Sequence, residues 1–367
     1  MQIVGGTLAR YFGLRFLSAV TAVFAGIVSL AMLVDYVELM RRAAEIPNVS
    51  ALLVAKTSIY RVPQVAERLM PFCVLIGAMS CYLNLSRRLE LVVARAAGMS
   101  AWQFIAPAVA VAFILGVAAT TIYNPISALL QEQSKRLEAD LFGQGPSSAV
   151  TTATGGTFWV RQKTDEGQAI ISANSSQQQG FQLNGVTVFG FDNNGSFKAR
   201  YEAKSAVLET KQWRLTDVRM YLLDAAPRDE ATLLLPTNLT HEQVRESFAT
   251  PESVPFWELP QYIAIAEQAG LAAPGYRLQF HKLLAKPFLL AAMVFLAAAV
   301  SLRFFRFGGV QKMVLSGVAA GFLLYVFSKV TDDMSKAELM PPLAAAWLPV
   351  LVGGVTGFVA LLHQEDG

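Results

Sequence analysis

The chain has 367 residues, of which 54% are hydrophobic and only 16% are charged, whereas about 25% are charged in an ordinary soluble domain. This is the composition of a membrane protein. The formal net charge is +3 and there is no run of five like charges, so charge gives no support to nucleic-acid binding. The two cysteines, Cys73 and Cys81, share one apolar segment, where we interpret them as small buried hydrophobic residues and not as a disulfide pair.

Six apolar segments are long enough, or nearly so, to cross a hydrocarbon core, which takes about 20 helical residues. The first follows Arg10 and Arg15, and it is too long for the apolar region of a cleaved signal peptide. The sequence therefore predicts six transmembrane helices, at 14–36, 60–85, 101–123, 281–302, 310–330 and 343–362.

The distribution of Lys and Arg predicts the orientation of these spans. Basic residues gather before the first span, between the second and third, and between the fourth and fifth, in the segment 303–312. Short loops rich in Lys and Arg stay in the cytoplasm. We therefore expect both termini to be cytoplasmic.

The segment 86–98, between spans two and three, has the pattern of a short amphipathic helix. At 3.6 residues per turn one face is apolar and the charged residues fall outside it. The apolar face consists of Leu89, Val92, Val93 and Ala96, and the charged residues are Arg88, Glu90 and Arg95. We expect this helix at the cytoplasmic membrane surface, where a cytoplasmic partner could bind it.

A hydrophilic insert of about 150 residues, roughly 124–274, separates spans three and four and is large enough for one domain. β-rich runs follow one another at 157–162, 169–172, 181–191, 197–209, 213–224 and 231–235. Turn signals accompany them, among them Asn184-Gly185. This spacing is typical of a sandwich, jelly roll or barrel. The flanks, 126–141 and 255–270, have a helical pattern.

Several catalytic and binding motifs are absent from the sequence. It contains no phosphate-binding Gly-x-x-x-x-Gly-Lys-Ser/Thr loop, no His-Glu-x-x-His and no Gly-x-Ser-x-Gly, and its three histidines are far apart. Asp35, Glu67, Arg68 and Lys329 lie near the outer ends of the expected spans and not at their centres. A membrane enzyme and an ion-coupled transporter are therefore weaker interpretations than a transporter driven by a partner.

Short sequence pieces, in a characteristic order, resemble the LptF/LptG family of lipopolysaccharide export permeases along the whole chain. The pieces are Leu89 to Gly98, Met70-Pro71-Phe72, Leu75-Ile76-Gly77, Asn124-Pro125, Trp213-Arg214-Leu215, Ser316-Gly317, Gly321 to Tyr325, Met340 to Leu343, and Trp347-Leu348-Pro349. Those in the last two spans are closer to the LptG branch. The resemblance implies an α-helical membrane protein with six spans, three before and three after a periplasmic all-β jellyroll-like domain.

By this resemblance the chain is one permease subunit of an ABC transporter that extracts lipopolysaccharide from the inner membrane and passes it to a periplasmic β-jellyroll bridge. It has no catalytic role and no cofactor, since ATP is bound by a partner. The implied partners are an LptB-like ATPase dimer, an LptF-like permease, an LptC-like membrane-anchored jellyroll protein and an LptA-like bridge. The implied regions are the first three spans (1–123, with a coupling helix at 86–98), the periplasmic domain (124–276) and the last three spans (277–367).

The resemblance assigns the amphipathic helix to coupling with the ATPase. The residues concerned are Arg88, Leu89, Glu90, Val92, Arg95 and Gly98. Charged contacts come from Glu90 and Arg95, while Leu89 and Val92 dock in a groove. The alternative is an interfacial helix whose arginines face lipid phosphates.

A lipid substrate with phosphates and acyl chains requires cations at the outer rim and apolar walls below. The candidate cations are Arg41, Arg42, Lys135 and Arg136, and the candidate wall residues include Leu33, Val34, Phe322 and Tyr325. Arg41 and Arg42 could equally be solvated loop charges, and the apolar residues could face lipid or pack internally. LptG members usually have a lysine at the position of Asp35, so one expected phosphate contact is missing here.

Gly317 and Gly321 form a small-xxx-small pair that favours close helix contact, either with a partner or within the chain.

A mechanotransmission subunit of the MacB or lipoprotein-release kind is the alternative function, but those proteins have one span before their extracytoplasmic domain and three after it.

Overall fold

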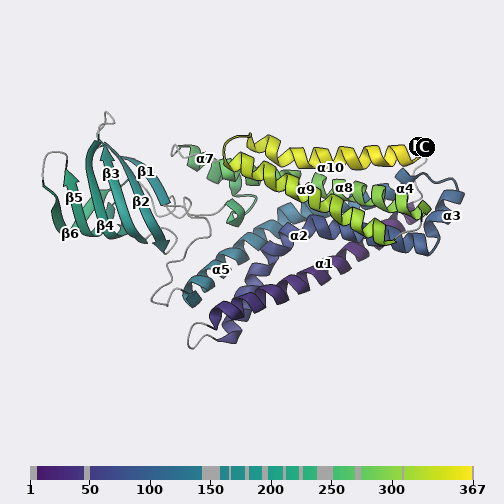
Figure 1. The fold of residues 1–367 in the computed structure, drawn as a ribbon, viewed down its shortest axis with the longest axis horizontal. Helices are drawn as coiled ribbons and strands as arrows, with labels where there is room; N and C mark the ends of the chain where they lie inside the picture. Colours follow the sequence, from purple (N-terminus) through teal and green to yellow (C-terminus); the bar gives the residue numbers. More distant parts are fainter. Residues whose placement is uncertain are drawn as a thin grey trace. The chain divides into compact units, whose positions relative to one another are not determined.

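The computed structural model describes residues 6–44, 50–142, 158–164, 167–177, 182–191, 197–209, 212–222, 226–237, 251–268, 274–307 and 310–365. These residues form two compact units (Figure 1). One is helical and the other contains a β-sheet. The helical unit comprises Met1–Leu141, Pro251–Pro260 and Pro274–Gly367, and the other unit comprises Phe142–Thr250 and Gln261–Ala273.

Six helices in the described part of the chain are long and apolar enough to cross a membrane. They are α1 (Gly6–Ala43), α2 (Ala51–Arg87), α4 (Ala101–Ala118) continued by a π-helical turn η1 (Ala119–Tyr123) and α5 (Asn124–Phe142), α8 (Pro274–Phe307), α9 (Val310–Lys336) and α10 (Pro342–Glu365). Each contains one of the expected spans. Shorter elements are α3 (Glu90–Ala96), η3 (Pro251–Ser253) and α7 (Leu259–Gln268). The expected fold class, six spans with an all-β insert after the third, is confirmed.

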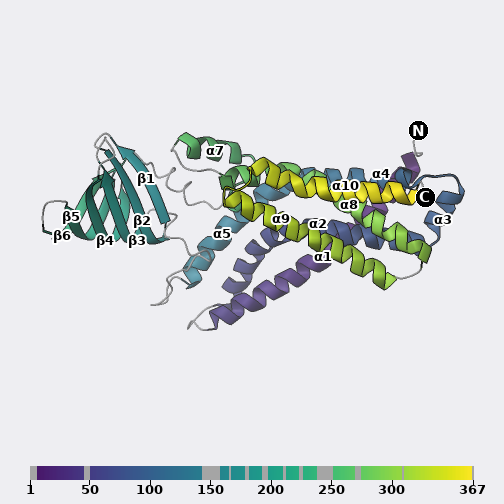
Figure 2. The ribbon, with the colours of Figure 1, turned by 45° about the horizontal axis from the view of Figure 1, so that its top comes forward.

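The positions of the first and last helices are consistent with an even number of membrane crossings. The start of α1, the end of α10 and α3 lie at the same end of this unit in both Figure 1 and Figure 2. We call this the inner end, and the opposite one the outer end.

Helix α8 forms the centre of the helical unit, because it packs against α2, α4, α9 and α10. Of its apolar segment 67% is buried, compared with 6% for α1 and 22% for α9. Helix α1 packs mainly on α2 and α4. The exposed apolar surfaces of α1 and α9 are therefore available to lipid or to other chains.

At the outer end of span three, a proline leaves one backbone carbonyl without its helical donor, and a side chain from another segment bonds to this carbonyl. Pro125 has no N–H to donate to the carbonyl of Thr121 four residues earlier. The indole Nε1 of Trp257 donates to that carbonyl oxygen at 3.1 Å. The π-helical turn Ala119–Tyr123 lies at this irregularity, as such turns often accompany an interrupted helical ladder.

Span four contains a second carbonyl of the same kind. Pro287 leaves the carbonyl of Leu283 without its helical donor, and the hydroxyl of Thr120 on η1 donates to it at 2.9 Å. Gly116 makes the approach possible, because a Cβ there would lie 2.4 Å from the Cα of Pro287. Neighbouring spans thus satisfy backbone groups that lipid could not.

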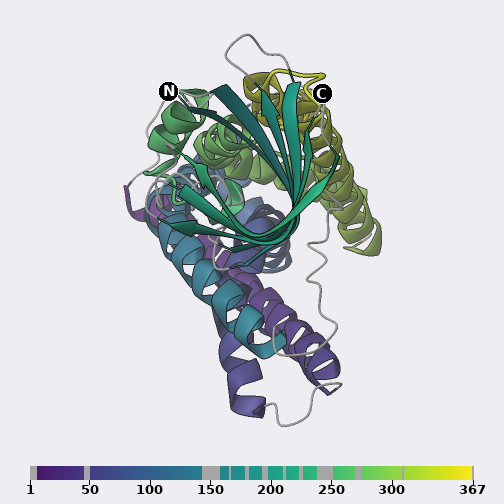
Figure 3. The same cartoon turned by 90° about the vertical axis from the view of Figure 1, so that its left-hand side faces the viewer.

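The six strands form one antiparallel sheet in consecutive order, so that each strand pairs with its neighbours in the chain. They are β1 (Phe158–Thr164), β2 (Gly167–Gln177), β3 (Gln182–Phe191), β4 (Phe197–Glu209), β5 (Gln212–Leu222) and β6 (Arg228–Pro236). Figure 3 shows the strands curving strongly around one face. That face holds an apolar cluster that includes Ile171, Leu183, Val188, Trp213 and Leu215.

The pairing is interrupted along one line across the sheet. Gly185 lacks a partner in the pairing of β3 with β4, and Asp217 lacks one in the pairing of β4 with β5. The register of β3 with β4 also shifts between Gly190 and Phe191. Gly185 and Asp217 both have positive φ, 62° and 53°. The expected turn at Asn184-Gly185 is therefore wrong: this dipeptide lies inside β3, where the left-handed conformation of glycine bends a strand and does not end it.

Candidate functional site

Helix α3 leaves α2 through a tight turn at the inner end of the helical unit. Leu89 adopts a left-handed conformation with φ 59° immediately before α3, and Gly98, with φ 85°, follows it. The N–H of Met99 donates to the carbonyl of Ala94 at 3.1 Å. The chain therefore holds α3 as a compact projection between α2 and α4.

The apolar stripe of α3 is not the face that packs against the rest of the chain. Leu91 and Ala94 are buried. Leu89 and Val93 are 60% and 67% exposed, and Val92 is also exposed. The apolar stripe is thus an uncovered surface beside the exposed Arg88 and Arg95, available to a second protein or to lipid.

Glu90 contacts the first span, a link that the sequence did not reveal. The hydroxyl of Tyr11 donates to Glu90 Oε2 at 2.9 Å. Arg15 Nε in turn donates to the Tyr11 hydroxyl at 3.1 Å, and the guanidinium lies 5.3 Å from the centre of the Tyr11 ring. A displacement of α3 would therefore be transmitted through this hydrogen bond to the inner part of α1.

At the outer end of α1, one carboxylate binds two of the four candidate rim cations. Glu38 accepts from Arg41 Nε at 3.1 Å and from Arg42 Nε at 2.9 Å. Both guanidinium groups stay exposed. The three side chains together carry one net positive charge, which still suits an anionic headgroup.

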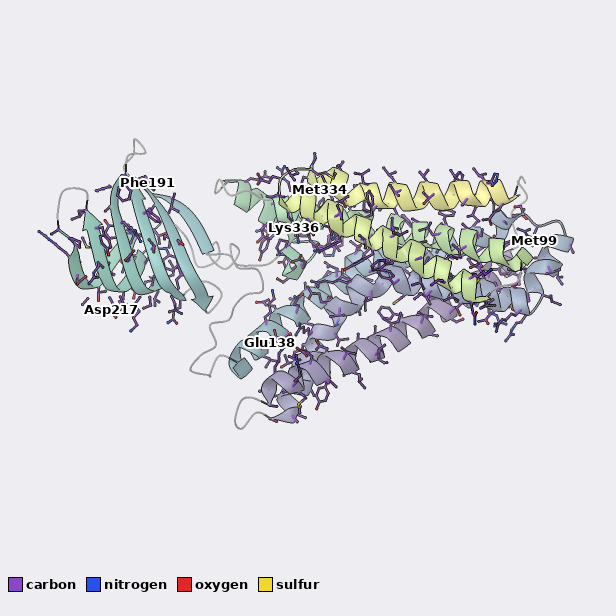
Figure 4. All side chains as sticks on the ribbon, viewed as in Figure 1. Met99, Glu138, Phe191, Asp217, Met334 and Lys336 are labelled. Atoms are coloured by element: carbon purple, nitrogen blue, oxygen red, sulfur yellow. The ribbon has the colours of Figure 1, made fainter. Side chains whose placement is uncertain are left out.

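Asp35 is hydrogen-bonded and paired within the chain. The Ser58 hydroxyl donates to Asp35 Oδ2 at 2.8 Å, and Arg61 Nε lies 3.4 Å from Asp35 Oδ1. Arg61 Nη1 also donates to Glu138 on α5 at 3.0 Å; Figure 4 labels Glu138. Sequence reasoning missed Arg61, although its position one turn from Ser58 on a polar stretch of α2 was a usable signal.

The remaining candidate rim residues lie on α5. Lys135 Nζ is 3.4 Å from the hydroxyl of Ser253. This cation therefore contacts η3, the short helix that precedes α7. The side chain of Arg136 lies outside the described residues.

The four candidate wall residues are exposed on two helices that both pack against α2. Leu33 and Val34 lie on α1, and Phe322 and Tyr325 lie on α9. The Tyr325 ring also contacts Phe72 of α2, with ring centroids 5.6 Å apart. The structure thus presents these side chains outward from the helical unit.

The small-residue pair of α9 contacts α2 of the same chain. A Cβ at Gly317 would lie 2.4 Å from Met79 Sδ, and one at Gly321 would lie 2.4 Å from Leu75 Cδ2. Of the two possibilities left open by the sequence, the contact within the chain is the observed one.

Two lysine–carboxylate pairs inside the helical unit were also missed. Lys286 Nζ lies 2.5 Å from Glu67 Oε1, and the two side chains are 12% and 11% exposed. Asn124 donates to Glu67 at 3.1 Å and accepts from the N–H of Phe256 at 3.0 Å. This cluster ties α2, α8 and both ends of the insert together.

The second pair joins α8 to α9 one helical turn away, since Lys282 Nζ lies 2.6 Å from Asp332 Oδ2. The signal in the sequence was two lysines four residues apart at the start of an apolar span. Among the described residues, no group of three or more His, Cys, Asp or Glu side chains is placed to hold a metal ion.

Comparison with known proteins gives one family over nearly the whole chain. Residues 10–363 match the family model described as lipopolysaccharide export system permease LptF/LptG. The chain is 23% identical over 365 residues to the lipopolysaccharide export system permease protein LptG of Escherichia coli K12, with 94% of each chain covered. It is also 23% identical over 377 residues to the Haemophilus influenzae protein of that name, with 98% of this chain and 99% of that one covered.

Proposed function

The chain belongs to the LptF/LptG family of lipopolysaccharide export permeases, and from this premise we propose that it is the LptG-type subunit of an ABC transporter. It is a multi-pass protein of the inner membrane. In the proposed role it helps to extract lipopolysaccharide from that membrane and pass it to a periplasmic β-jellyroll bridge. The observation that carries the proposal is the family match across residues 10–363.

We further propose that both termini and α3 are cytoplasmic and that the β-sheet unit is periplasmic. The basic segments at the inner end support this orientation, because Lys and Arg are retained in the cytoplasm. The proposed regions are 1–123, 124–276 and 277–367, with the middle one as the periplasmic domain. The partners in this arrangement are an LptF-like permease, an LptC-like membrane-anchored protein and an LptA-like bridge.

An LptB-like ATPase dimer is the proposed partner of α3. The uncovered side chains of Leu89 and Val92 support docking into an apolar groove, since a well-packed apolar anchor is the usual centre of an interface. Arg88 and Arg95 would contact acidic groups at its rim, and Gly98 permits the turn that follows. ATP is bound by the partner, and this chain holds no cofactor.

The hydrogen bond from Tyr11 to Glu90 gives the coupling a physical route. A shift of α3 changes the position of a carboxylate that is bonded to α1. Helix α1 also carries Leu33, Val34, Arg41 and Arg42. Displacement at the ATPase is therefore transmitted to the helix proposed to contact the lipid.

For the substrate, we propose that phosphates lie near the exposed arginines of α1 and near Lys135 and Arg136, with acyl chains against Leu33, Val34, Phe322 and Tyr325. Guanidinium groups are well suited to bind phosphate oxygens. Arg61 pairs with Asp35 as well as with Glu138, so the change from lysine at that position does not leave an unpaired carboxylate facing the headgroup.

The test is reconstitution in lipid nanodiscs with an LptF-like permease and an LptB-like ATPase. We expect purified lipopolysaccharide to raise ATP hydrolysis only when all three proteins are present. Stimulation without this chain, or indifference to the lipid, contradicts the proposal.

Variants of α3 sharpen the same measurement. Leu89→Asp should abolish ATPase co-purification, whereas Leu339→Asp, at an exposed apolar residue beyond α9, is the matched control and should not. Tyr11→Phe removes the bond to Glu90 but keeps the carboxylate. If Tyr11→Phe lowers stimulation as much as Glu90→Ala does while the ATPase stays bound, Glu90 acts through α1 and not through direct contact with the ATPase.

A further inference from the structure

The outer end of α9 is fixed to α10 by a third carbonyl freed by a proline. Pro349 leaves the carbonyl of Ala345 without its helical donor. The buried hydroxyl of Thr331 lies 3.1 Å from that carbonyl oxygen and 3.0 Å from the carbonyl oxygen of Ser328 in its own helix, so its proton is shared between the two. Unlike the two earlier cases, this bond joins a mostly exposed helix, α9, to its neighbour.

The next residue of α9 fixes it to α8. Asp332 is buried and its carboxylate pairs with Lys282 Nζ at 2.6 Å. Separating the two would leave the Asp332 carboxylate, which is only 10% exposed, without its cationic partner, whereas Lys282 is 39% exposed and can be solvated. Figure 4 labels Met334 and Lys336, which mark this end of α9.

The contact of α9 with α2 has a different chemistry. It consists of Gly321 against Leu75, Gly317 against Met79, and the ring contact of Tyr325. Among the described residues of α2 and α9, no hydrogen bond or ion pair joins the two helices. Lipid tails are as apolar as these side chains, so an acyl chain can replace this contact at little cost, but it cannot replace the bonds of Thr331 and Asp332.

From this difference we propose that α9 moves as one body with α8 and α10, and that it separates from α2 when lipid is taken up or released. Lys282, Thr331 and Asp332 are the positioning residues that keep α9 on the α8–α10 side. The contact of Gly321 and Gly317 with Leu75 and Met79 is the surface that opens. This inference rests on the proposed function, in which α9 lines the lipid path.

Two cysteine pairs on opposite sides of α9 test the proposal, in the full complex with Cys73→Ser and Cys81→Ser. Leu75→Cys with Gly321→Cys bridges α9 to α2. Leu324→Cys with Gly353→Cys bridges α9 to α10, where a Cβ on Gly353 would lie 2.8 Å from Leu324 Cδ2. Each pair combines one leucine with one glycine, so the two variants are matched.

We expect oxidation of the α2–α9 pair to abolish ATP-driven lipopolysaccharide release, and reduction to restore it. Oxidation of the α9–α10 pair should leave release unchanged. Loss of release with the α9–α10 bridge, or full release with the α2–α9 bridge, overturns the inference. In either case, release by both reduced complexes shows that the proposed function still holds. If the reduced complexes and the unsubstituted complex release no lipid, the proposed function fails, and the inference falls with it.

The positioning role has a separate readout, the amount of lipid released per ATP hydrolysed. Asp332→Asn should lower this ratio while hydrolysis continues, because α9 is no longer held to α8. The exchanged pair, Lys282→Asp with Asp332→Lys, should restore it. A merely structural role predicts instead a parallel loss of folded protein and of both activities, and no rescue by exchange.

Discussion

Two charged pairs, one in each unit of this protein, lie in opposite environments. In the helical unit Glu67 and Lys286 are only 11% and 12% exposed. In the sheet unit Arg219 and Asp229 are 57% and 69% exposed, although their geometry is as good, with two nitrogen–oxygen contacts of 2.7 and 3.0 Å. Similar chemical groups therefore have different consequences for the two units.

The difference follows from what drives each unit to fold. The sheet gains stability by removing an apolar cluster from water, at about 25 cal/mol per Å² of apolar surface, and its surface pairs add little. Between helices in a membrane this driving force is lacking, because lipid and side chains are equally apolar. Polar contacts then decide which helix faces which neighbour. Removing them should disturb the helical unit far more than the sheet.

The largest effect is expected for Glu67→Ala. It leaves the Lys286 ammonium buried without its carboxylate, which should lower the stability of the helical unit by about 3–5 kcal/mol. Thermal unfolding of the purified chain in detergent measures this. The double variant Glu67→Met with Lys286→Met should regain most of the loss, since an apolar pair of similar size often replaces a buried ion pair without cost.

Glu38→Ala is the control for this prediction. Glu38 also binds basic side chains, Arg41 and Arg42, but at the exposed end of α1. Its removal should shift the unfolding temperature very little. Equal shifts for Glu38→Ala and Glu67→Ala would contradict the role assigned to burial.

The sequence predicted the elements of both units well, because they depend on local patterns. All six spans lie within observed helices, and the run 197–209 is β4 with both bounds unchanged. Apolar length and β-rich alternation are properties of a few consecutive residues. The turn expected at Asn184-Gly185 failed because a glycine with positive φ serves a bent strand as well as a turn.

The candidate site was predicted less completely, because it depends on contacts between distant residues. Glu67 and Lys286 are 219 positions apart, and no local pattern pairs them. On α3, periodicity identified an apolar stripe but not which face packs inward. Leu91 and Ala94 fill that role, so the stripe stayed free. The residues assigned to ATPase coupling and to lipid contact remain predictions.

A smaller effect in the helical unit is expected for Thr120→Val. The change keeps the side-chain shape but leaves the carbonyl of Leu283, freed by Pro287, without its donor. Hydrogen bonds between helices in membranes contribute about 0.6 kcal/mol on average and at most about 1.7 kcal/mol. We expect a decrease of the unfolding temperature corresponding to this range.

Thr121→Val is the matched control, one residue away. The Thr121 hydroxyl donates to the carbonyl of Val117 in its own span at 2.8 Å. This carbonyl is not freed by a proline, because the residue four positions later is Thr121 itself, which has a backbone N–H. This variant should unfold at nearly the original temperature. If the two threonine variants are equally destabilised, bonds to carbonyls freed by prolines have no special weight.

The smallest effect is expected in the sheet, for Asp229→Asn. Hydrogen bonds from Arg219 hold the pKa of the Asp229 carboxyl below its ordinary value. A lowered pKa in the folded state means that the pair stabilises the sheet above the ordinary pKa of aspartate, and that this contribution is lost as the pH falls through the lowered value. Hydrogen exchange of peptides from β5 and β6 should therefore differ slightly between the variant and the original chain at neutral pH, and not at all at a pH below the lowered pKa. Because both side chains are exposed, water screens the pair and already solvates each partner alone. A destabilisation of β6 by Asp229→Asn as large as that of the helices by Glu67→Ala would contradict this comparison. It would mean that the contribution of an ion pair to stability does not depend on its burial in this protein.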